Sequence, residues 1–341
     1  MDRDNRFHEL DVLRGLAAFA VVLSHQVLGF GRDPGFHDLD GWFDWVGPAE
    51  FYYAGRLPVV MFFMLSGFVI HRALDRCASF PEFAFARVTR LYPVYWVGVA
   101  LTATVLWFDL AGTGGARPEP ARILANVTMV QHHIGYASLD PVYWTLLYEM
   151  RFYLALGLIH FSPLRRLLLP ILAIWLAASL GNALLTDTSD RLTLTERIFN
   201  LPYAHFFAAG VAFSLFVGRA SRLGFTLIVA SAMIVALYWP PVPALIALCF
   251  WPIFWLAISG RLRALDQPVL RWLGAISYPL YLVHQPIGFA LGHRLNDTGT
   301  PALVTMATTI AASLVVAHLV MRWIERPTMR WARRVRTREQ R

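Results

Sequence analysis

The sequence predicts an all-α integral membrane protein, and three observations support that prediction. First, 57% of its 341 residues are hydrophobic and 15% are charged, against about 45–50% and about 25% in soluble domains. Second, apolar stretches of about 20 residues, enough to cross a bilayer as a helix, recur along the whole chain. Third, the 30 basic residues are all arginine and gather between these stretches. This composition excludes an ordinary soluble enzyme, a disordered chain and a secreted disulfide scaffold.

Ten stretches are apolar enough to be predicted as membrane spans. We expect the ninth to be kinked at Pro279 and Pro286, because proline removes an intrahelical hydrogen bond. The first is expected to remain as a span, since no A-x-A cleavage site follows it. The ten stretches lie near residues 10–30, 57–74, 91–111, 142–161, 167–185, 198–217, 223–239, 244–260, 272–292 and 302–322.

The arginines indicate the orientation of the chain. With both termini in the cytoplasm, 19 arginines fall on the cytoplasmic side and 7 on the outer side, a clear positive-inside asymmetry. Nucleic-acid binding is disfavoured because the arginines are scattered between apolar blocks. The two cysteines lie in no metal-ligand pattern, so the sequence does not predict a metal site at them. We therefore expect one membrane domain over residues 1–341, with a core at 10–327 and a basic cytoplasmic tail at 328–341.

The first predicted span contains two ionisable residues, Arg14 and His25. Eleven helical residues turn the chain back to within about 20° of the same face and raise it by about 16 Å. Because ionisable side chains are costly inside a bilayer, this spacing predicts a functional slot with a cation at one end and an imidazole at mid-depth. The alternatives are that Arg14 only snorkels to the headgroups and that His25 is a packing residue.

Three further segments carry candidate residues. Arg87 and Arg90 lie three apart on a predicted helix and can hold one phosphate group together, although both can instead mark the cytoplasmic side. Glu149 is a carboxylate in an apolar segment, so it needs a salt-bridge partner such as Arg14 or Arg72, or it has a catalytic role. The remaining candidates for substrate binding are polar residues in or beside these spans: Ser66, Arg72, Tyr148, Tyr278 and His284.

Taken in order, these segments resemble the membrane acyltransferase-3 family of bacterial sugar O-acyltransferases. The chain is similar to that family from residue 10 to residue 327. Thr145 is a departure from the family pattern, which often has serine there. The matching motifs are Leu10–His25, Phe62–Phe68, the Arg-x-x-Arg of Arg87–Arg90 with Leu91-Tyr92-Pro93, Trp144–Glu149 leading to Phe152–Leu154, Ser277–His284 and Glu325-Arg326-Pro327.

The resemblance implies about ten spans in a bacterial cytoplasmic (inner) membrane, with acyl-CoA as the cytoplasmic donor and no bound cofactor. It also implies that His25 is the catalytic histidine, that Arg14 is its essential partner, and that Arg87 and Arg90 bind the donor. Since no hydrolase-like domain follows the tenth span, we expect direct transfer to the final acceptor.

The resemblance implies acyl-CoA as the donor and acetyl as the expected acyl group, and we expect cytoplasmic acyl-CoA to bring its thioester to His25. The imidazole then takes the proton from a sugar hydroxyl that arrives from the outer side. Glu149 orients the ring or stabilises the imidazolium. The outer segments 31–56 and 112–141 are expected to select a carbohydrate or lipid-linked glycan acceptor. Two alternatives stay open: acylation of a small molecule such as a macrolide, and a proton-coupled transporter built on the buried His, Glu and Arg residues.

Overall fold

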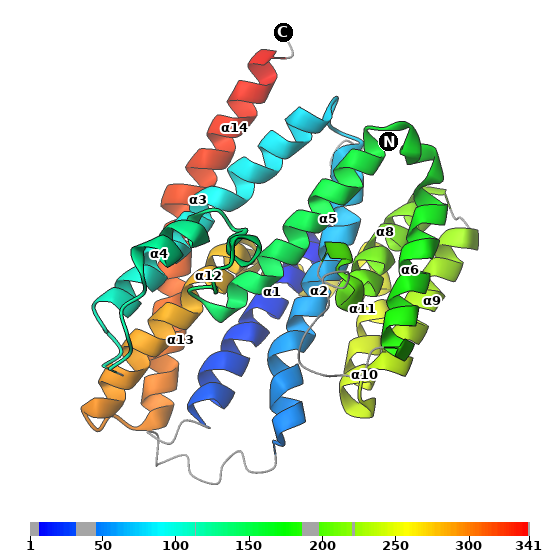
Figure 1. Ribbon diagram of the computed structural model, residues 1–341. Helices are drawn as coiled ribbons and strands as arrows, with labels where there is room; N and C mark the ends of the chain where they lie inside the picture. Colours follow the sequence, from blue (N-terminus) through cyan, green and yellow to red (C-terminus); the bar gives the residue numbers. More distant parts are fainter. Residues whose placement is uncertain (1–6, 32–45, 113, 186–197, 220–221, 340–341) are drawn as a thin grey trace. The chain divides into compact units, whose positions relative to one another are not determined.

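The computed structural model describes residues 7–31, 46–112, 114–185, 198–219 and 222–339. Within these ranges every regular element is helical and there is no β-strand (Figure 1). The all-α prediction is therefore confirmed, whereas ten spans and cytoplasmic termini remain predictions. Five helices are long and apolar enough to cross a membrane: His8–Leu28, Tyr52–Leu74, Pro163–Leu184, Pro241–Ile258 and Ala302–Thr337.

The described residues divide into two compact units. The first unit takes its residues from Met1–Arg14, Leu57–Phe85 and Tyr148–Gln267, and the second from Gly15–Arg56, Ala86–Leu147 and Pro268–Arg341. Both units are built from segments far apart in the sequence, as expected where helices contribute stripes of apolar residues to a shared core.

The first unit has an aromatic core. The ring centroids of Phe152 and Phe207 lie 4.4 Å apart and those of Phe63 and Phe207 lie 4.6 Å apart, so three helices meet there. Stacked aromatic pairs of this kind add to the free energy gained by burial. The helices of this unit are α2 (Pro48–Leu74) from Leu57 onward, α5 (Trp144–His160) from Tyr148 onward, α6 (Leu168–Leu185), α8 (Ala204–Arg219), α9 (Arg222–Tyr238), α10 (Pro241–Leu248) and α11 (Phe250–Ile258).

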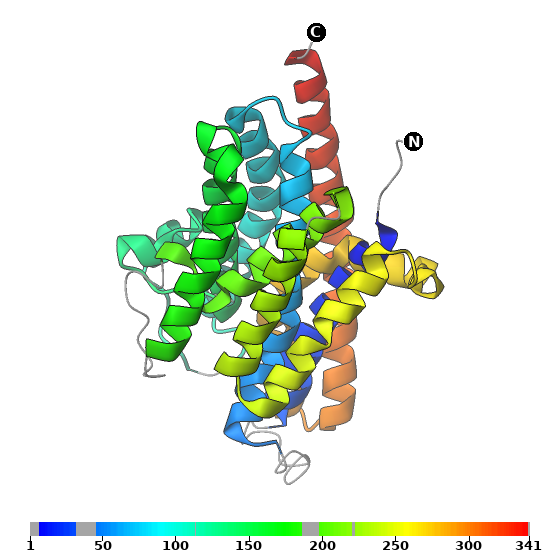
Figure 2. The same ribbon diagram turned by 90° about the vertical axis from the view of Figure 1, so that its right-hand side faces the viewer.

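The second unit is organised around a long helix, α12 (Pro268–Asp297), which packs along its neighbour α13 (Ala302–Val320) (Figure 1). Helix α13 continues through the π-helical turn η8 (Met321–Glu325) into α14 (Arg326–Glu339), as Figure 2 also shows. The unit also contains α1 (His8–Leu23) from Gly15 onward, the π-helical turn η1 (Ser24–Leu28), α3 (Phe80–Trp107) from Ala86 onward and α4 (Pro120–Val127).

Helices α1 and α12 touch backbone to backbone at a pair of glycines. A Cβ atom on Gly15 would lie 2.5 Å from the backbone nitrogen of Gly274, so a side chain there cannot be accommodated without a shift. Small residues permit this close approach between membrane helices. His25 and His284 are separated by the same 259 residues as the two glycines. The two contacts therefore show that α1 and α12 run parallel.

The helices depart from the predicted spans in two places. The predicted stretch 244–260 is divided at Cys249 into α10 and α11. Pro279 and Pro286 both lie inside α12, one helix from Pro268 to Asp297, and the kink expected there stays a prediction. Helix α2 starts at Pro48, nine residues before the predicted edge, so Arg56 belongs to a helix rather than to an outer loop.

Candidate functional site

His25 lies on a π-helical turn at the end of α1. The turn η1 covers Ser24–Leu28 and follows α1 without a break. Single π-helical turns inside α-helices are frequent at functional sites, because they redirect one or two side chains. The Ser24 hydroxyl lies 2.9 Å from both the Ala20 and the Ala54 carbonyl oxygens, which fixes the turn against α2.

The structure brings together two of the predicted site residues, His25 and His284. Nδ1 of His25 lies 2.9 Å from Nε2 of His284, and the two rings are nearly parallel, with 8° between their planes. His284 is completely buried, whereas His25 is partly exposed. The pair therefore has an inner member that only the protein contacts and an outer member that an incoming group can reach.

The backbone around His284 determines which nitrogens carry protons in the neutral pair. Nδ1 of His284 lies 2.9 Å from the Tyr281 carbonyl oxygen and 3.2 Å from that of Leu280. A carbonyl can only accept, so this nitrogen donates and Nε2 of His284 is left as an acceptor. Nδ1 of His25 then donates to it. The Nε2 lone pair of His25 remains available for a proton.

Gly55 of α2 lies beside the available nitrogen. A Cβ atom on Gly55 would be 3.3 Å from Nε2 of His25, tighter than an ordinary contact. The absence of a side chain therefore leaves room at the one nitrogen of the pair that can act as a base. The sequence does not mark Gly55 as a site residue, because glycine is common in membrane helices and carries no chemical signal of its own.

Gln26 holds the backbone of the histidine pair in place. Its side-chain amide donates to the His284 carbonyl oxygen at 2.9 Å and to Oγ of Ser313 at 3.1 Å. Ser313 in turn donates to the Thr309 carbonyl oxygen at 2.7 Å, so its hydroxyl is free to accept. Gln26 is 2% exposed. It joins η1, α12 and α13, a role the sequence signals only by its place next to His25.

A second set of hydrogen bonds ties the start of α5 to α12. The hydroxyl groups of Thr145 and Tyr281 lie 2.8 Å apart, and both reach the Val142 carbonyl oxygen. Tyr281 is also the residue whose carbonyl accepts from His284. Thr145 keeps the hydroxyl that a serine would supply, so the departure from the family pattern preserves this contact.

Tyr278, another predicted site residue, donates to the Leu91 carbonyl oxygen at 2.9 Å and so joins α12 to α3. Arg87 and Arg90 lie on α3 three residues apart, as predicted, and each is partly exposed. These three residues belong to the second unit together with the histidine pair.

The first unit contains the predicted carboxylate, Glu149. One of its oxygens, Oε1, accepts from the hydroxyl groups of both Ser66 and Tyr153. No arginine of the described chain lies within ion-pair distance of Glu149. The alternative of a salt bridge to Arg14 or Arg72 is therefore wrong, and hydroxyl groups hold this carboxylate instead.

The other predicted residues of this unit have local partners. Nη2 of Arg14 lies 3.0 Å from Oδ1 of Asp11. The Arg72 guanidinium lies over the Phe68 ring, 5.6 Å from its centroid. Tyr148 is buried, and its carbonyl oxygen accepts from Asn200 at 2.8 Å. Arg14 belongs to the first unit and His25 to the second, so their predicted partnership stays a prediction.

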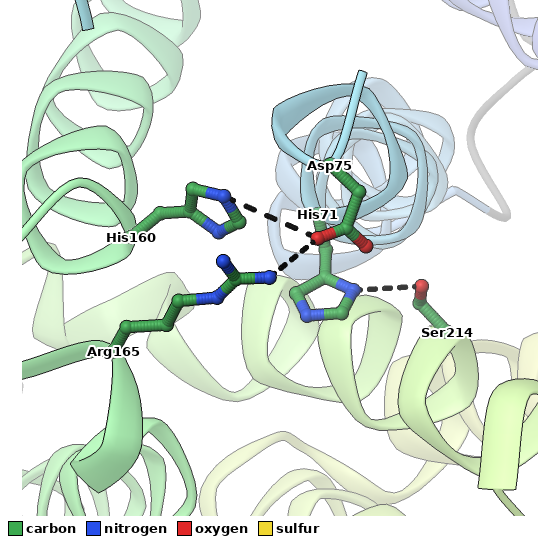
Figure 3. A network of polar contacts seen from close by, with 5 residues as sticks. All are labelled: His71, Asp75, His160, Arg165 and Ser214. Atoms are coloured by element: carbon green, nitrogen blue, oxygen red, sulfur yellow. Dashed lines mark hydrogen bonds and ion pairs between the residues drawn. The ribbon is translucent and has the colours of Figure 1, made fainter. Parts of the chain in front are cut away.

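A second polar cluster lies at the end of α2 (Figure 3). Oδ1 of Asp75 lies 3.0 Å from Nη2 of Arg165 and 4.0 Å from Nε2 of His160, while His71 contacts Ser214 at 2.9 Å. These contacts tie α2 to the turn after α5 and to α8. In the described part of the chain, no three His, Cys, Asp or Glu side chains come close enough to hold a metal ion.

Comparison with known proteins assigns the family. The sequence profile of an acyltransferase domain, acyltransferase-3, matches residues 7–322. The chain belongs to the acyltransferase-3 family. It is therefore a membrane acyltransferase enzyme, and the predicted resemblance is confirmed.

Two curated relatives are similar to this acyltransferase, one over most of the chain and the other over part of it. Acyltransferase MdmB of Streptomyces mycarofaciens is 26% identical over 375 residues, covering 95% of this chain and 92% of the relative. Protein 2 in the picA locus of Rhizobium radiobacter is 37% identical over 103 residues, covering 29% of this chain and 44% of the relative. No solved structure matches.

Proposed function

We propose that this enzyme transfers an acyl group, namely acetyl, from cytoplasmic acyl-CoA to a hydroxyl group of a carbohydrate acceptor at the outer face. The geometry of the histidine pair carries the proposal. His284 fixes the tautomer of His25, and Nε2 of His25 is left with a lone pair beside the side-chain-free backbone at Gly55. A general base within hydrogen-bond reach of a hydroxyl group is what acyl transfer to an alcohol requires.

The proposed reaction proceeds in two proton transfers. Nε2 of His25 takes the hydroxyl proton as the acceptor oxygen attacks the thioester carbonyl carbon. The tetrahedral intermediate collapses, the carbon–sulfur bond breaks, and the CoA thiolate takes the proton back from the imidazolium. The Nδ1–H of His25 stays on His284 throughout, as an orienting partner holds the imidazole in hydrolases of the Ser-His-Asp type. The enzyme then returns to its starting protonation state.

The arginines supply donor binding in this proposal. Arg14, Arg72, Arg87 and Arg90 hold the phosphate groups of acyl-CoA, for which guanidinium groups are well matched. Ser66, Tyr148 and Tyr278 contribute to the walls of the substrate path, and Glu149 supplies negative charge that stabilises the imidazolium. No bound cofactor is needed, because acyl-CoA is itself the donor substrate.

We also propose the setting of this reaction. The chain is a multi-pass protein of a bacterial cytoplasmic membrane, with ten spans and both termini in the cytoplasm. The 19-to-7 distribution of arginines supports this orientation. It puts the start of α2 and the segment 112–141 on the acceptor side. Residues 32–45 of the first outer segment, also expected to contact the acceptor, lie outside the described residues.

Substitution of His25 tests the proposal. His25→Ala removes the base, and we expect transfer to fall by roughly 10²–10⁴ because general-base catalysis contributes that much. The measurement is release of free CoA together with mass spectrometry of the acylated glycan, using protein purified in detergent. Unchanged turnover in a His25→Ala protein that still inserts into the membrane would disprove the role of His25.

A further inference from the structure

Arg56 is a charged residue near the start of a helix that is long and apolar enough to cross a membrane, Tyr52–Leu74. The Arg56 guanidinium lies over the ring of Tyr52, 3.3 Å from its centroid, and faces the ring of Trp144 at 5.9 Å. It therefore lies against two aromatic rings, one from α2 and one from α5. Guanidinium groups stack on aromatic faces in this way and keep their edge donors available.

The hydrogen-bonding capacity of Arg56 is largely unused. Its Nη1 donates to the Tyr52 carbonyl oxygen at 3.3 Å, whereas its buried Nε has no acceptor among the described residues. No aspartate or glutamate in the described ranges lies within ion-pair distance of it. A guanidinium carries five N–H donors, so an anion can still bind it through two parallel hydrogen bonds.

Arg56 and Trp144 each have a sequence neighbour that lies at the histidine pair or at Tyr281, the residue that accepts from His284. Gly55 lies against Nε2 of His25. Thr145 contacts the Tyr281 hydroxyl group, and the Tyr281 carbonyl oxygen accepts from His284. All of these residues belong to the second unit. A cation with no ion-pair partner among the described residues and two aromatic rings are therefore connected, through adjacent residues, to the proposed base.

We propose that Arg56, with Tyr52 and Trp144, binds an anionic group of the acceptor, a carboxylate or a phosphate carried by the carbohydrate. This inference rests on the proposed function, in which α2 begins at the outer face and the acceptor arrives there. Tyr52 is 50% exposed, so its ring is accessible to a sugar. Aromatic rings supply apolar contact area for the acceptor, and the guanidinium supplies recognition of its charge.

A pair of acceptors that differ only in charge tests this assignment. The probes are a glucuronic-acid oligosaccharide and its neutral methyl ester, with acetyl-CoA as donor and the full chain in detergent. We expect kcat/KM to be roughly tenfold higher for the acid, in line with a charged hydrogen bond. Arg56→Gln should bring the acid-to-ester ratio close to one, and Arg56→Lys should retain part of it. A phosphorylated oligosaccharide, compared with its unphosphorylated form, distinguishes phosphate from carboxylate.

Arg166→Gln is the control, because Arg166 is exposed and lies in the turn after α5, outside every segment assigned to the acceptor or the donor. This variant should keep the acid-to-ester ratio of the wild type. A wild-type ratio near one, or a full ratio in Arg56→Gln, would overturn the assignment.

A binding titration separates failure of this inference from failure of the proposed function. Tryptophan fluorescence of the protein is followed while the acid or the ester is added, without acetyl-CoA. Tighter binding of the acid that disappears in Arg56→Gln supports the role of Arg56 even if no acceptor is acylated. Equal binding of acid and ester overturns it even if transfer proceeds.

Discussion

The histidine pair of the second unit and the carboxylate of the first unit are both polar groups inside apolar helices, but their hydrogen-bonding capacity is used differently. Oε1 of Glu149 accepts from two hydroxyl groups, those of Ser66 and Tyr153. His25 makes one bond through Nδ1, and its Nε2 lies beside a glycine. Buried polar groups are normally paired, so an available lone pair indicates chemistry more strongly than burial does.

The two regions also support their ionisable groups in different ways. Side chains hold Glu149, whereas the backbone carbonyl of Tyr281 holds His284 and thereby His25. A backbone carbonyl has no protonation state near neutral pH, so it fixes the tautomer of the pair wherever both imidazoles are neutral. We therefore expect substitutions in the histidine pair to affect catalysis more than substitutions around Glu149.

The largest effect after that of His25 is expected for His284. His284→Ala removes the acceptor for Nδ1 of His25, so the imidazole can adopt the wrong tautomer, and we expect kcat to fall roughly 10–100-fold. His284→Gln retains an acceptor oxygen and should recover part of the activity. The measurement is kcat as a function of pH for the three proteins. Identical pH profiles with equal losses in both variants would indicate a packing role only.

A smaller effect is expected at Gly55. Gly55→Ala adds a methyl group about where a substrate oxygen would approach Nε2 of His25, since its Cβ would lie 3.3 Å from that nitrogen. We expect roughly tenfold slower transfer, because displacement of reacting groups by about 1 Å has large kinetic costs. Gly29→Ala is the control, because no atom lies within 4 Å of a Cβ built there. Equal rates in the two variants would contradict the assignment.

The substitution Glu149→Gln addresses the first unit. Glutamine keeps an oxygen that accepts from Ser66 and Tyr153 but removes the charge. We therefore expect kcat to fall by about fivefold at most, with KM unchanged. The reaction rate at varied acetyl-CoA concentration measures both quantities. A loss as large as that of His25→Ala would show that Glu149 takes part directly in the reaction and would reverse our comparison of the two regions.

Much of the fold could be predicted from the sequence, because hydropathy reports directly on helices that lie in lipid. The described helices overlap all ten predicted stretches. The change from α10 to α11 at Cys249, inside the helical stretch Pro241–Ile258, escaped prediction because the stretch is apolar on both sides of it. The single helix α12 through Pro279 and Pro286 agrees with the single span predicted there, since neighbouring helices can satisfy the backbone groups that proline frees.

The candidate site was less predictable, because its geometry depends on tertiary register. The sequence marks His25 and His284 as buried ionisable residues, but their pairing follows from the parallel packing of α1 and α12. Gly55 and Gln26 carry no chemical signal in sequence. The sequence predicts an outer segment at 31–56 that includes Arg56, and only the longer α2 brings Arg56 to Tyr52 and Trp144.

Asp140 provides the smallest expected effect, a change in stability rather than in rate. This residue lies in the segment before α5, is 1% exposed, and its Oδ1 accepts from the backbone nitrogen of Val142 at 2.9 Å. Burial raises the pKa of Asp140 from 3.8 to about 7. Unlike Oε1 of Glu149, which has two donors, the Asp140 carboxyl group has one recorded donor.

The direction of the pH dependence follows from that shift. The folded protein keeps the Asp140 proton between about pH 4 and pH 7, whereas the unfolded chain releases it. The contribution of this group to the free energy of unfolding is therefore largest below about pH 4 and is lost as the pH rises to about 7.

Asp140→Asn does not titrate and still accepts from Val142. The variant should be more stable than the wild type above pH 7, and the difference should shrink toward pH 4. Thermal unfolding in detergent from pH 4 to 8 measures this, with the exposed Asp297→Asn as control. A difference that does not vary with pH would refute it.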